Sequence, residues 1–262
     1  MMASKENEYI SPQQLAEILP LEEGDTVLIA SNVERLVWNA VHNDQSFDFN
    51  LLIDLLQKRI GNEGNILFPA YNWDFCKGVV WDYHKTKSQT GTLSRIALKR
   101  ADFVRTRHAI YSFAVWGKEA RTLYEMNDRN SFIGNTPFAF LDSQENSKMV
   151  TLDVNLTDCF TYVHYIEELN GVPYRFRKNF IGQYIDENGK EETRTYSMYV
   201  RYLDRPVITD FTGLENELLQ DEKMKLIKFG DIVIRVLPFR DVHEIVERDI
   251  KNNNFNNIVR LE

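Results

Sequence analysis

The sequence predicts an α/β fold, in which a mixed, mostly parallel central sheet is flanked by helices, with an antiparallel excursion in the C-terminal third. Two observations lead to this prediction. Along most of the chain, short apolar runs alternate with segments of helical periodicity, which is typical of parallel strands joined by crossover helices. Residues 174–203 instead contain two segments rich in β-prone residues around Glu187-Asn188-Gly189-Lys190, a sequence typical of a hairpin turn.

The first elements carry clear boundary signals. Ser11 is a favourable N-cap, and Pro12 occupies the first helical position, where its missing N–H is tolerated. Residues 24–31 then form an apolar run that predicts a buried strand. This strand ends at two polar residues, Ser31 and Asn32.

Helices and strands continue to alternate after this point. Residues 48–61 repeat apolar positions at helical spacing and end at Gly61, and residues 65–71 read as a second buried strand. Residues 117–126 predict a helix, and residues 148–154 predict another buried strand. We therefore expect neighbouring parallel strands in this part of the sheet.

The segment around the middle of the chain predicts a further helix. We expect it to be capped by Asp158 and to end at Gly171. Near the C-terminus, residues 230–238 predict a strand and residues 240–250 a surface helix. No linker, repeat or low-complexity block divides the sequence, so we predict one domain spanning residues 1–262.

Composition limits the class of protein. The chain has 262 residues, 43% of them hydrophobic, which is enough for a sizeable core. Its formal charge of -8 argues against nucleic acid as a main partner. Cys76 and Cys159 are too few for a disulfide framework, and the sequence shows neither an apolar signal region nor an apolar run of membrane-spanning length. We therefore expect a soluble, cytoplasmic protein.

His164 and Glu167 are the first candidates for chemistry. They lie three residues apart in the stretch TYVHYIEE, so on a helix their side chains can meet. The pair follows a strand, a turn and a helix start, where open α/β sheets place ligands. A neutral imidazole there can act as a general base. The alternative interpretation is a histidine that only packs or forms a structural hydrogen bond.

A second candidate cluster contains His108 with Arg105, Arg107 and Ser112. The two arginines are suited to bind a phosphate, although a solvated basic turn is the alternative. The nearby stretches FPAYNWDFC and VVWDYHK mix aromatic and acidic residues, which occur at carbohydrate or cation sites and also in ordinary cores. We find no metal-ligand spacing and no glycine-rich phosphate loop of the Walker or Rossmann type.

Six segments in order, from about residue 25 to 170, resemble the aminoglycoside 3-N-acetyltransferase family. They are DTVLIASN, EGNILFPAYNW, TGTLSRIALKR, VRTRHAIYSFAVWG, SFIGNTPFAFL and TYVHYIEE. The C-terminal third resembles the family more loosely. The resemblance implies a mixed α/β fold distinct from the GNAT fold, and an acetyl-CoA-dependent enzyme that acetylates a primary amine of an amino sugar.

The resemblance also implies roles for individual residues. His164 takes the place of the family's catalytic histidine and Glu167 that of the motif's acid, so that His164 would deprotonate the amine for direct transfer. The coenzyme would contact residues of two segments: Ser31, Asn32 and Val33 through backbone N–H groups, and Arg105, Thr106, His108 and Ser112 on the family's RSxHPxxS element. The chain departs from that pattern at Asn32, Thr106 and Ala109.

The predicted acceptor site draws on several parts of the chain: Tyr71, Trp73, Asp74, Arg175 and, from the looser region, Asp210. Arg175, Arg177 and Lys178 follow the helix of His164, which favours a nucleotide-linked amino sugar of surface polysaccharide biosynthesis slightly over an aminoglycoside. We expect this small-molecule amine as the partner, with acetyl-CoA as co-substrate, no metal, no nucleic acid and no membrane. The sequence is compatible with a monomer or a homodimer.

Two rival functions remain on sequence grounds. One is a protein of the same fold that binds coenzyme A or a sugar without turnover. The other is a hydrolase that uses Ser112 with His108, although the chain has no GxSxG nucleophile elbow.

Overall fold

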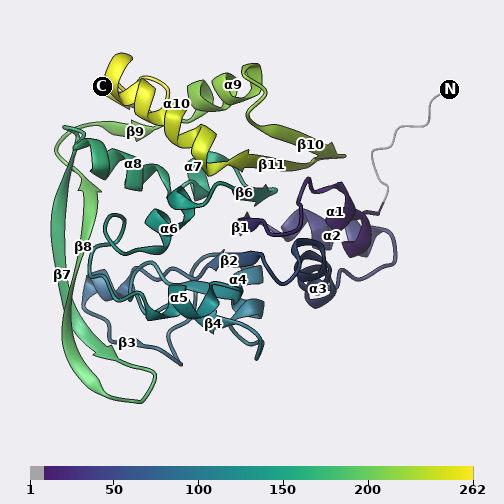
Figure 1. Ribbon diagram of the computed structural model, residues 1–262, viewed down its shortest axis with the longest axis horizontal. Coiled ribbons are helices and arrows are strands. Elements are labelled where there is room, and N and C mark those ends of the chain that lie inside the picture. The colour runs from purple at the N-terminus through teal and green to yellow at the C-terminus, as the bar shows by residue number, and fades with distance from the viewer. Residues whose placement is uncertain (1–8, 262) are drawn as a thin grey trace.

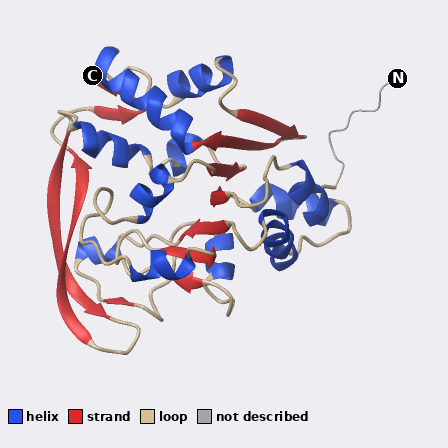
Figure 2. Ribbon diagram, in the orientation of Figure 1, coloured by secondary structure: helices blue, strands red, loops and turns tan. Residues whose placement is uncertain are grey.

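A seven-stranded mixed sheet forms the centre of the molecule (Figures 1 and 2). The structure is a computed structural model that describes residues 9–261. In sheet order the strands are β10 (Lys225–Phe229), β11 (Ile232–Pro238), β6 (Ser147–Leu152), β1 (Thr26–Ser31), β2 (Asn65–Pro69), β5 (Phe113–Gly117) and β4 (Val104–Arg105). β1 runs parallel to both β2 and β6, whereas the outer pairs are antiparallel. The predicted mixed α/β fold is confirmed, but the expectation of a mostly parallel sheet is wrong: within residues 9–261, only the two pairs of β1 are parallel and the other four pairs of this sheet are antiparallel.

Helices cover both faces of this sheet. They are α1 (Pro12–Ile18), α2 (Glu34–His42), α3 (Phe49–Ile60), α4 (Thr92–Ala97), α5 (Ala120–Glu125), α6 (Pro137–Ser143), α7 (Leu156–Cys159), α8 (Val163–Asn170), α9 (Thr212–Gln220) and α10 (Phe239–Asn252). Alternate residues of β1 enter two separate cores, because side chains point to opposite faces of a strand. Val27 and Ile29 pack with α1 and α3, whereas Leu28 and Ala30 share the core of α8 and α10.

Local sequence signals account for several helix ends, and one prediction is wrong. Ser11 forms a capping box with Gln14 at the start of α1, and Gly171 ends α8 in the left-handed conformation at φ 60°. Asp158, however, lies inside the short helix α7 rather than capping α8, which begins at Val163. The break between α7 and α8 turns the Asp158 side chain toward the cavities described below.

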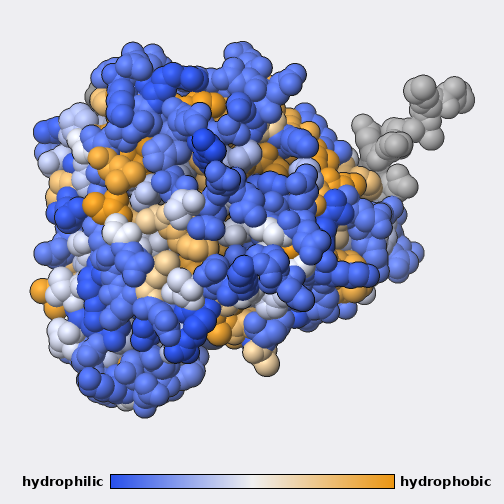
Figure 3. All heavy atoms as spheres, in the orientation of Figure 1, coloured by the Kyte–Doolittle hydropathy of each residue, from blue (hydrophilic) through white to orange (hydrophobic). Residues whose placement is uncertain are grey.

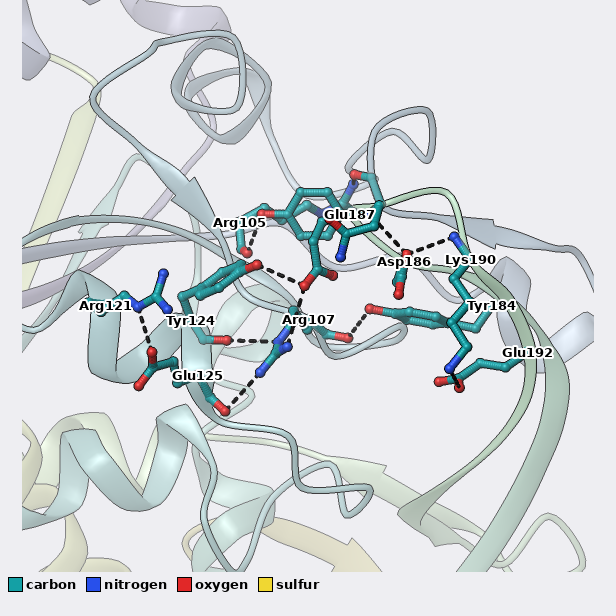
Figure 4. A network of polar contacts seen from close by, with 12 residues as sticks. Arg105, Arg107, Arg121, Tyr124, Glu125, Tyr184, Asp186, Glu187, Lys190 and Glu192 are labelled. Carbon is teal, nitrogen blue, oxygen red and sulfur yellow. Dashed lines mark hydrogen bonds and ion pairs between the residues drawn. The ribbon is translucent and has the colours of Figure 1, made fainter.

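The predicted antiparallel excursion is a long hairpin, β7 (Arg175–Ile185) and β8 (Glu191–Arg201), which forms the curved arm on the left of Figure 1. A short strand, β3 (Trp81–Asp82), pairs with β7, and β9 (Val207–Thr209) pairs with β12 (Val259–Leu261). At the hairpin tip, Glu187 accepts from Tyr124 and pairs with Arg107 (Figure 4). The arm is thus fixed at its tip, while its other end begins directly after α8.

Hydrophilic groups predominate on the face shown in Figure 3, where apolar atoms form separate patches. None of the helices within residues 9–261 has the length and apolar character that crossing a membrane requires.

Candidate active site

The His164–Glu167 pair predicted from the sequence forms on α8. His164 Nδ1 lies 2.6 Å from Glu167 Oε2, as the one-turn spacing allows. The two side chains differ sharply in exposure: that of His164 is 23% exposed, and that of Glu167 is 1% exposed. The imidazole therefore faces solvent on one side and a buried carboxylate on the other.

Glu167 is held by two further groups that the sequence pattern did not indicate as partners. The Tyr174 hydroxyl donates to Oε1 at 2.8 Å, and Arg175 Nε forms an ion pair with Oε2 at 2.7 Å. Burial raises the pKa of Glu167, but His164 and Arg175, together with the Tyr174 hydrogen bond, outweigh burial and leave that pKa lowered. Glu167 is consequently a fixed carboxylate at neutral pH.

The same surroundings keep His164 neutral. Burial lowers the pKa of His164 and Arg175 lowers it further, which outweighs the opposing effect of Glu167. Since Glu167 is ionised, Nδ1 donates to it, and Nε2 is left as the basic nitrogen. A neutral imidazole held in one tautomer is the form that a general base requires.

Two adjacent cavities connect this pair with the end of β1. His164 lines a cavity of about 200 Å³, and Ser31 lines a second cavity of about 340 Å³. Both are bordered by the same four residues: Trp73, Asp158, Cys159 and Thr161. An elongated ligand that enters beside Ser31 can therefore reach toward His164.

The three residues predicted near the coenzyme pyrophosphate differ in what they offer. Ser31 lines the larger cavity. Gly91 also borders it, and a Cβ at Gly91 would make a tight contact of 3.2 Å with the Ser31 carbonyl oxygen. Asn32 N already donates to the Leu152 carbonyl, and its side chain accepts from Glu34 N. Val33 is buried at the start of α2.

The residues of the RSxHPxxS-like segment are bound to one another and to nearby backbone. Arg105 donates to Ser112 Oγ at 3.1 Å and to the carbonyl oxygens of Tyr83, Thr86 and Ala70. Thr106 Oγ1 accepts from the Phe113 amide at 2.8 Å. These contacts hold β4 and β5 against the end of β2. The four residues predicted near the coenzyme do not line either of the two cavities described above; they are Arg105, Thr106, His108 and Ser112.

The same segment gives no support to the hydrolase hypothesis. Ser112 donates its hydroxyl proton to the Ala70 carbonyl at 2.7 Å. His108 Nδ1 accepts from the amides of Ile110 and Tyr111, and burial lowers the pKa of His108 to about 3. Nδ1 of this histidine is thus already occupied and cannot take a proton from Ser112.

The predicted acceptor residues lie in different places. Tyr71 and Trp73 line the cavities, and Arg175 lies against Glu167 instead. Asp74 contacts Lys77 and Gln89, which lowers the pKa of Asp74. The carboxylate of Asp210 pairs with Arg260 and accepts from Thr212, although its neighbours Thr209 and Phe211 border the smaller cavity.

Several cavity residues were missed by the sequence reasoning. Asp158, Cys159 and Thr161 lie six, five and three residues before His164, so proximity to the motif was the available signal. Tyr111 and Phe211 are distant in sequence and carried no signal. Burial raises the pKa of Cys159 to about 12, which keeps this thiol protonated.

No group of three His, Cys, Asp or Glu side chains in the described part of the chain is arranged to hold a metal ion. A family model described as aminoglycoside 3-N-acetyltransferase matches residues 29–251, which is most of the chain. The chain belongs to this family and is an acyltransferase of the aminoglycoside 3-N-acetyltransferase type. A search of curated proteins finds no match.

Solved structures share the fold over nearly the whole length. A sisomicin-bound AAC-VIa is 17% identical, with a TM-score of 0.74 over 94% of this chain and 99% of that one. AAC-IIIb in a binary complex with CoASH is 15% identical, with a TM-score of 0.73 over 94% and 98%. The YokD protein from Bacillus subtilis is 20% identical, with a TM-score of 0.72 over 95% and 96%. At these identities the likeness establishes the fold.

Proposed function

We propose that the protein transfers an acetyl group from acetyl-CoA to a primary amine of an amino sugar, with His164 as the general base. The observation that carries this proposal is the neutral His164, anchored through Nδ1 to a buried carboxylate and bordering a cavity that adjoins the one at Ser31. A structure of similar fold was solved with CoASH, which supports acetyl-CoA as the donor.

The transfer needs no covalent enzyme intermediate. An amino sugar arrives as an ammonium, which first releases one proton to solvent and so becomes an amine with a free electron pair. Nε2 of His164 accepts a second proton from the nitrogen as that nitrogen bonds to the thioester carbonyl carbon, and the carbon–sulfur bond then breaks. The imidazolium returns a proton to the departing thiolate, so the products are an amide and free coenzyme A.

Glu167 assists by its position and charge. It keeps the His164 ring in the tautomer with Nε2 unprotonated, and it stabilises the imidazolium that forms transiently. Its own ionised form is maintained by Tyr174 and Arg175, so the proton stays on the imidazole rather than passing to the carboxylate.

The cavity at His164 favours a cationic amine as acceptor. Its lining includes the exposed carboxylate of Asp158 and no lysine or arginine. Two of the three basic residues expected to hold a phosphate are engaged elsewhere, Arg175 with Glu167 and Arg177 with Glu168 at 2.8 Å. The third, Lys178, lies over the Phe180 ring and does not line the cavity. An aminoglycoside-like amine fits this cavity, and an AAC-VIa of similar fold was solved with sisomicin. A nucleotide-linked amino sugar would have to place its phosphates outside the cavity.

Release of free thiol from acetyl-CoA tests the proposal. The wild-type protein would be assayed against aminoglycosides in one plate and nucleotide-linked amino sugars in another, beside His164→Ala and a matched control, His42→Ala, on the exposed end of α2. We expect amine-dependent release that His164→Ala abolishes and His42→Ala retains. Equal release without any amine, or full release by His164→Ala, would contradict the proposal.

A further inference from the structure

A basic groove lies on the other side of α4 from the Ser31 cavity. It has a volume of about 660 Å³ and is lined by residues of the segments 83–88, 92–99 and 103–105. The chain between the two hollows contributes to both: Gln89, Thr90 and Gly91 border the Ser31 cavity, whereas Ser88 and Thr92 border the groove. The groove is therefore a separate site.

Positive charge gathers in this groove in a chain whose net charge is -8. None of its lining residues is acidic, and the cations among them are Lys85, Lys87, Arg95, Lys99 and Arg105. Lys85 pairs with Asp82 at 3.2 Å, whereas Lys87, Arg95 and Lys99 have no carboxylate within ion-pair distance in residues 9–261. Like charges repel one another, so binding of an anion would lower the electrostatic repulsion between these cations.

Asp82, which directly precedes the groove segment 83–88, pairs with Lys85, and two further carboxylates, Asp102 and Asp54, are engaged by Arg100. Asp102 accepts from Arg100 and Gln57, and Asp54 also pairs with Arg100 at 2.7 Å. Because this ion-pair network satisfies both carboxylates through Arg100, neither compensates the lysines of the groove.

Arg105 fixes the wall that carries two of the lysines. Its guanidinium donates to the carbonyl oxygens of Tyr83 and Thr86, and its own carbonyl accepts from the Tyr83 hydroxyl at 2.8 Å. It lies near the hairpin-tip network of Figure 4 and over the Trp81 ring at 4.8 Å. Burial lowers the pKa of Arg105 to about 10, so it stays charged at neutral pH. The wall is held in place before any ligand binds.

The remaining lining is apolar. Ile96, Leu98, Phe103 and Val104 line the groove together with Tyr83, so the groove combines apolar surface with cations. A planar heterocyclic base can cover such a surface while its phosphates reach the cations.

We propose that the basic groove binds a nucleoside phosphate, with the phosphates against Lys87, Arg95 and Lys99 and the base on the apolar surface. This ligand chemistry has two sources in the proposed reaction, the adenosine phosphate of the coenzyme and the nucleotide of a nucleotide-linked acceptor. The choice of ligand rests on the proposed function, whereas the groove itself is defined without His164.

Titration calorimetry with three separate probes tests this site: adenosine 3′,5′-bisphosphate, uridine diphosphate and inorganic phosphate. The variants are the groove triple Lys87→Ala/Arg95→Ala/Lys99→Ala and a control that also removes three exposed cations, Lys58→Ala/Lys225→Ala/Lys228→Ala. We expect at least one nucleoside phosphate to bind the wild type, roughly tenfold or more weakly to the groove triple, and unchanged to the control. Thermal unfolding of both variants verifies that they fold.

The relative affinities of the probes identify which nucleoside phosphate the groove binds. Preference for the adenosine probe assigns the groove to the coenzyme, and preference for the uridine probe assigns it to a nucleotide-linked acceptor. Binding by neither nucleoside phosphate, equal loss in the control triple, or equal affinity for inorganic phosphate alone overturns the proposal. His164→Ala should bind the probes as the wild type does, so this result is independent of whether the proposed acetyl transfer occurs.

Discussion

The two histidine segments of this protein look alike in sequence but differ in structure. His164 and His108 each stand among polar and aromatic residues in a segment that resembles the same family. His164 borders a cavity and leaves Nε2 available, whereas His108 is 9% exposed and uses Nδ1 to accept two backbone amides. The comparison teaches that a polar motif indicates chemistry only when the fold leaves one reactive atom facing a cavity.

The largest expected effect in this comparison is on turnover. His164→Ala should lower kcat by about 10²- to 10⁴-fold, because it removes the general base. Coenzyme affinity should stay within about twofold. Steady-state kinetics and calorimetry with coenzyme A measure the two effects, and a kcat within threefold of wild type would refute the assignment.

His108→Ala should instead lower stability. The variant leaves the buried amides of Ile110 and Tyr111 without their acceptor, which destabilises the fold by about 1–3 kcal/mol. Urea unfolding measures the loss, and His108→Asn, which retains an acceptor, is the conservative control. A tenfold fall in kcat of the folded His108→Ala protein would show that this segment does take part in the reaction.

His108 should also contribute to the pH dependence of the free energy of unfolding. Because the folded pKa of His108 is lowered to about 3 from 6.5, the unfolded chain binds the extra proton. The contribution of His108 is complete above about pH 6.5 and is lost progressively as the pH falls toward 3. Over this range the free energy of unfolding should vary less with pH in His108→Asn than in the wild type. An equal dependence on pH in the two proteins would contradict the prediction.

Arg175 offers a test at the other histidine. Arg175→Met removes a cation that lowers the pKa of His164, so the acid limb of kcat/KM should move to higher pH by on the order of one unit. Arg175→Lys should restore part of the shift. Arg177→Met, which changes the partner of Glu168 instead, is the matched control and should leave the limb in place. An unmoved limb in Arg175→Met would mean that this arginine does not set the protonation of His164.

The smallest effect is expected at Ser112. Ser112→Ala removes the hydroxyl that joins Arg105 to the Ala70 carbonyl, so stability should fall by about 1 kcal/mol. Turnover should be unchanged within twofold. Thermal unfolding and the thiol-release assay measure both quantities, and loss of thiol release would revive a nucleophilic role for this serine.

The features that depend on near neighbours along the chain could be predicted from the amino-acid sequence. The alternation of apolar runs predicted the α/β class, Glu187–Lys190 predicted the hairpin, and one-turn spacing predicted that His164 and Glu167 meet. Each of these follows from the repeat of a helix or strand or from the conformational preferences of turn residues. The helix start at Asp158 was wrong, because a break after α7 intervenes, and the mostly parallel sheet was wrong, because four of its six strand pairs are antiparallel.

The role of each polar group depends on segments that meet only in the folded protein. Arg175 contacts Glu167 because the turn after α8 places the first residue of β7 beside this carboxylate, and Asp210 pairs with Arg260 because β9 and β12 pair across 50 residues of chain. The five cations of the basic groove come from three segments that sequence spacing does not relate. The burial of a side chain, the charges around it and the shape of a cavity depend on which distant segments come together. Those contacts form only when helices pack on both faces of the sheet.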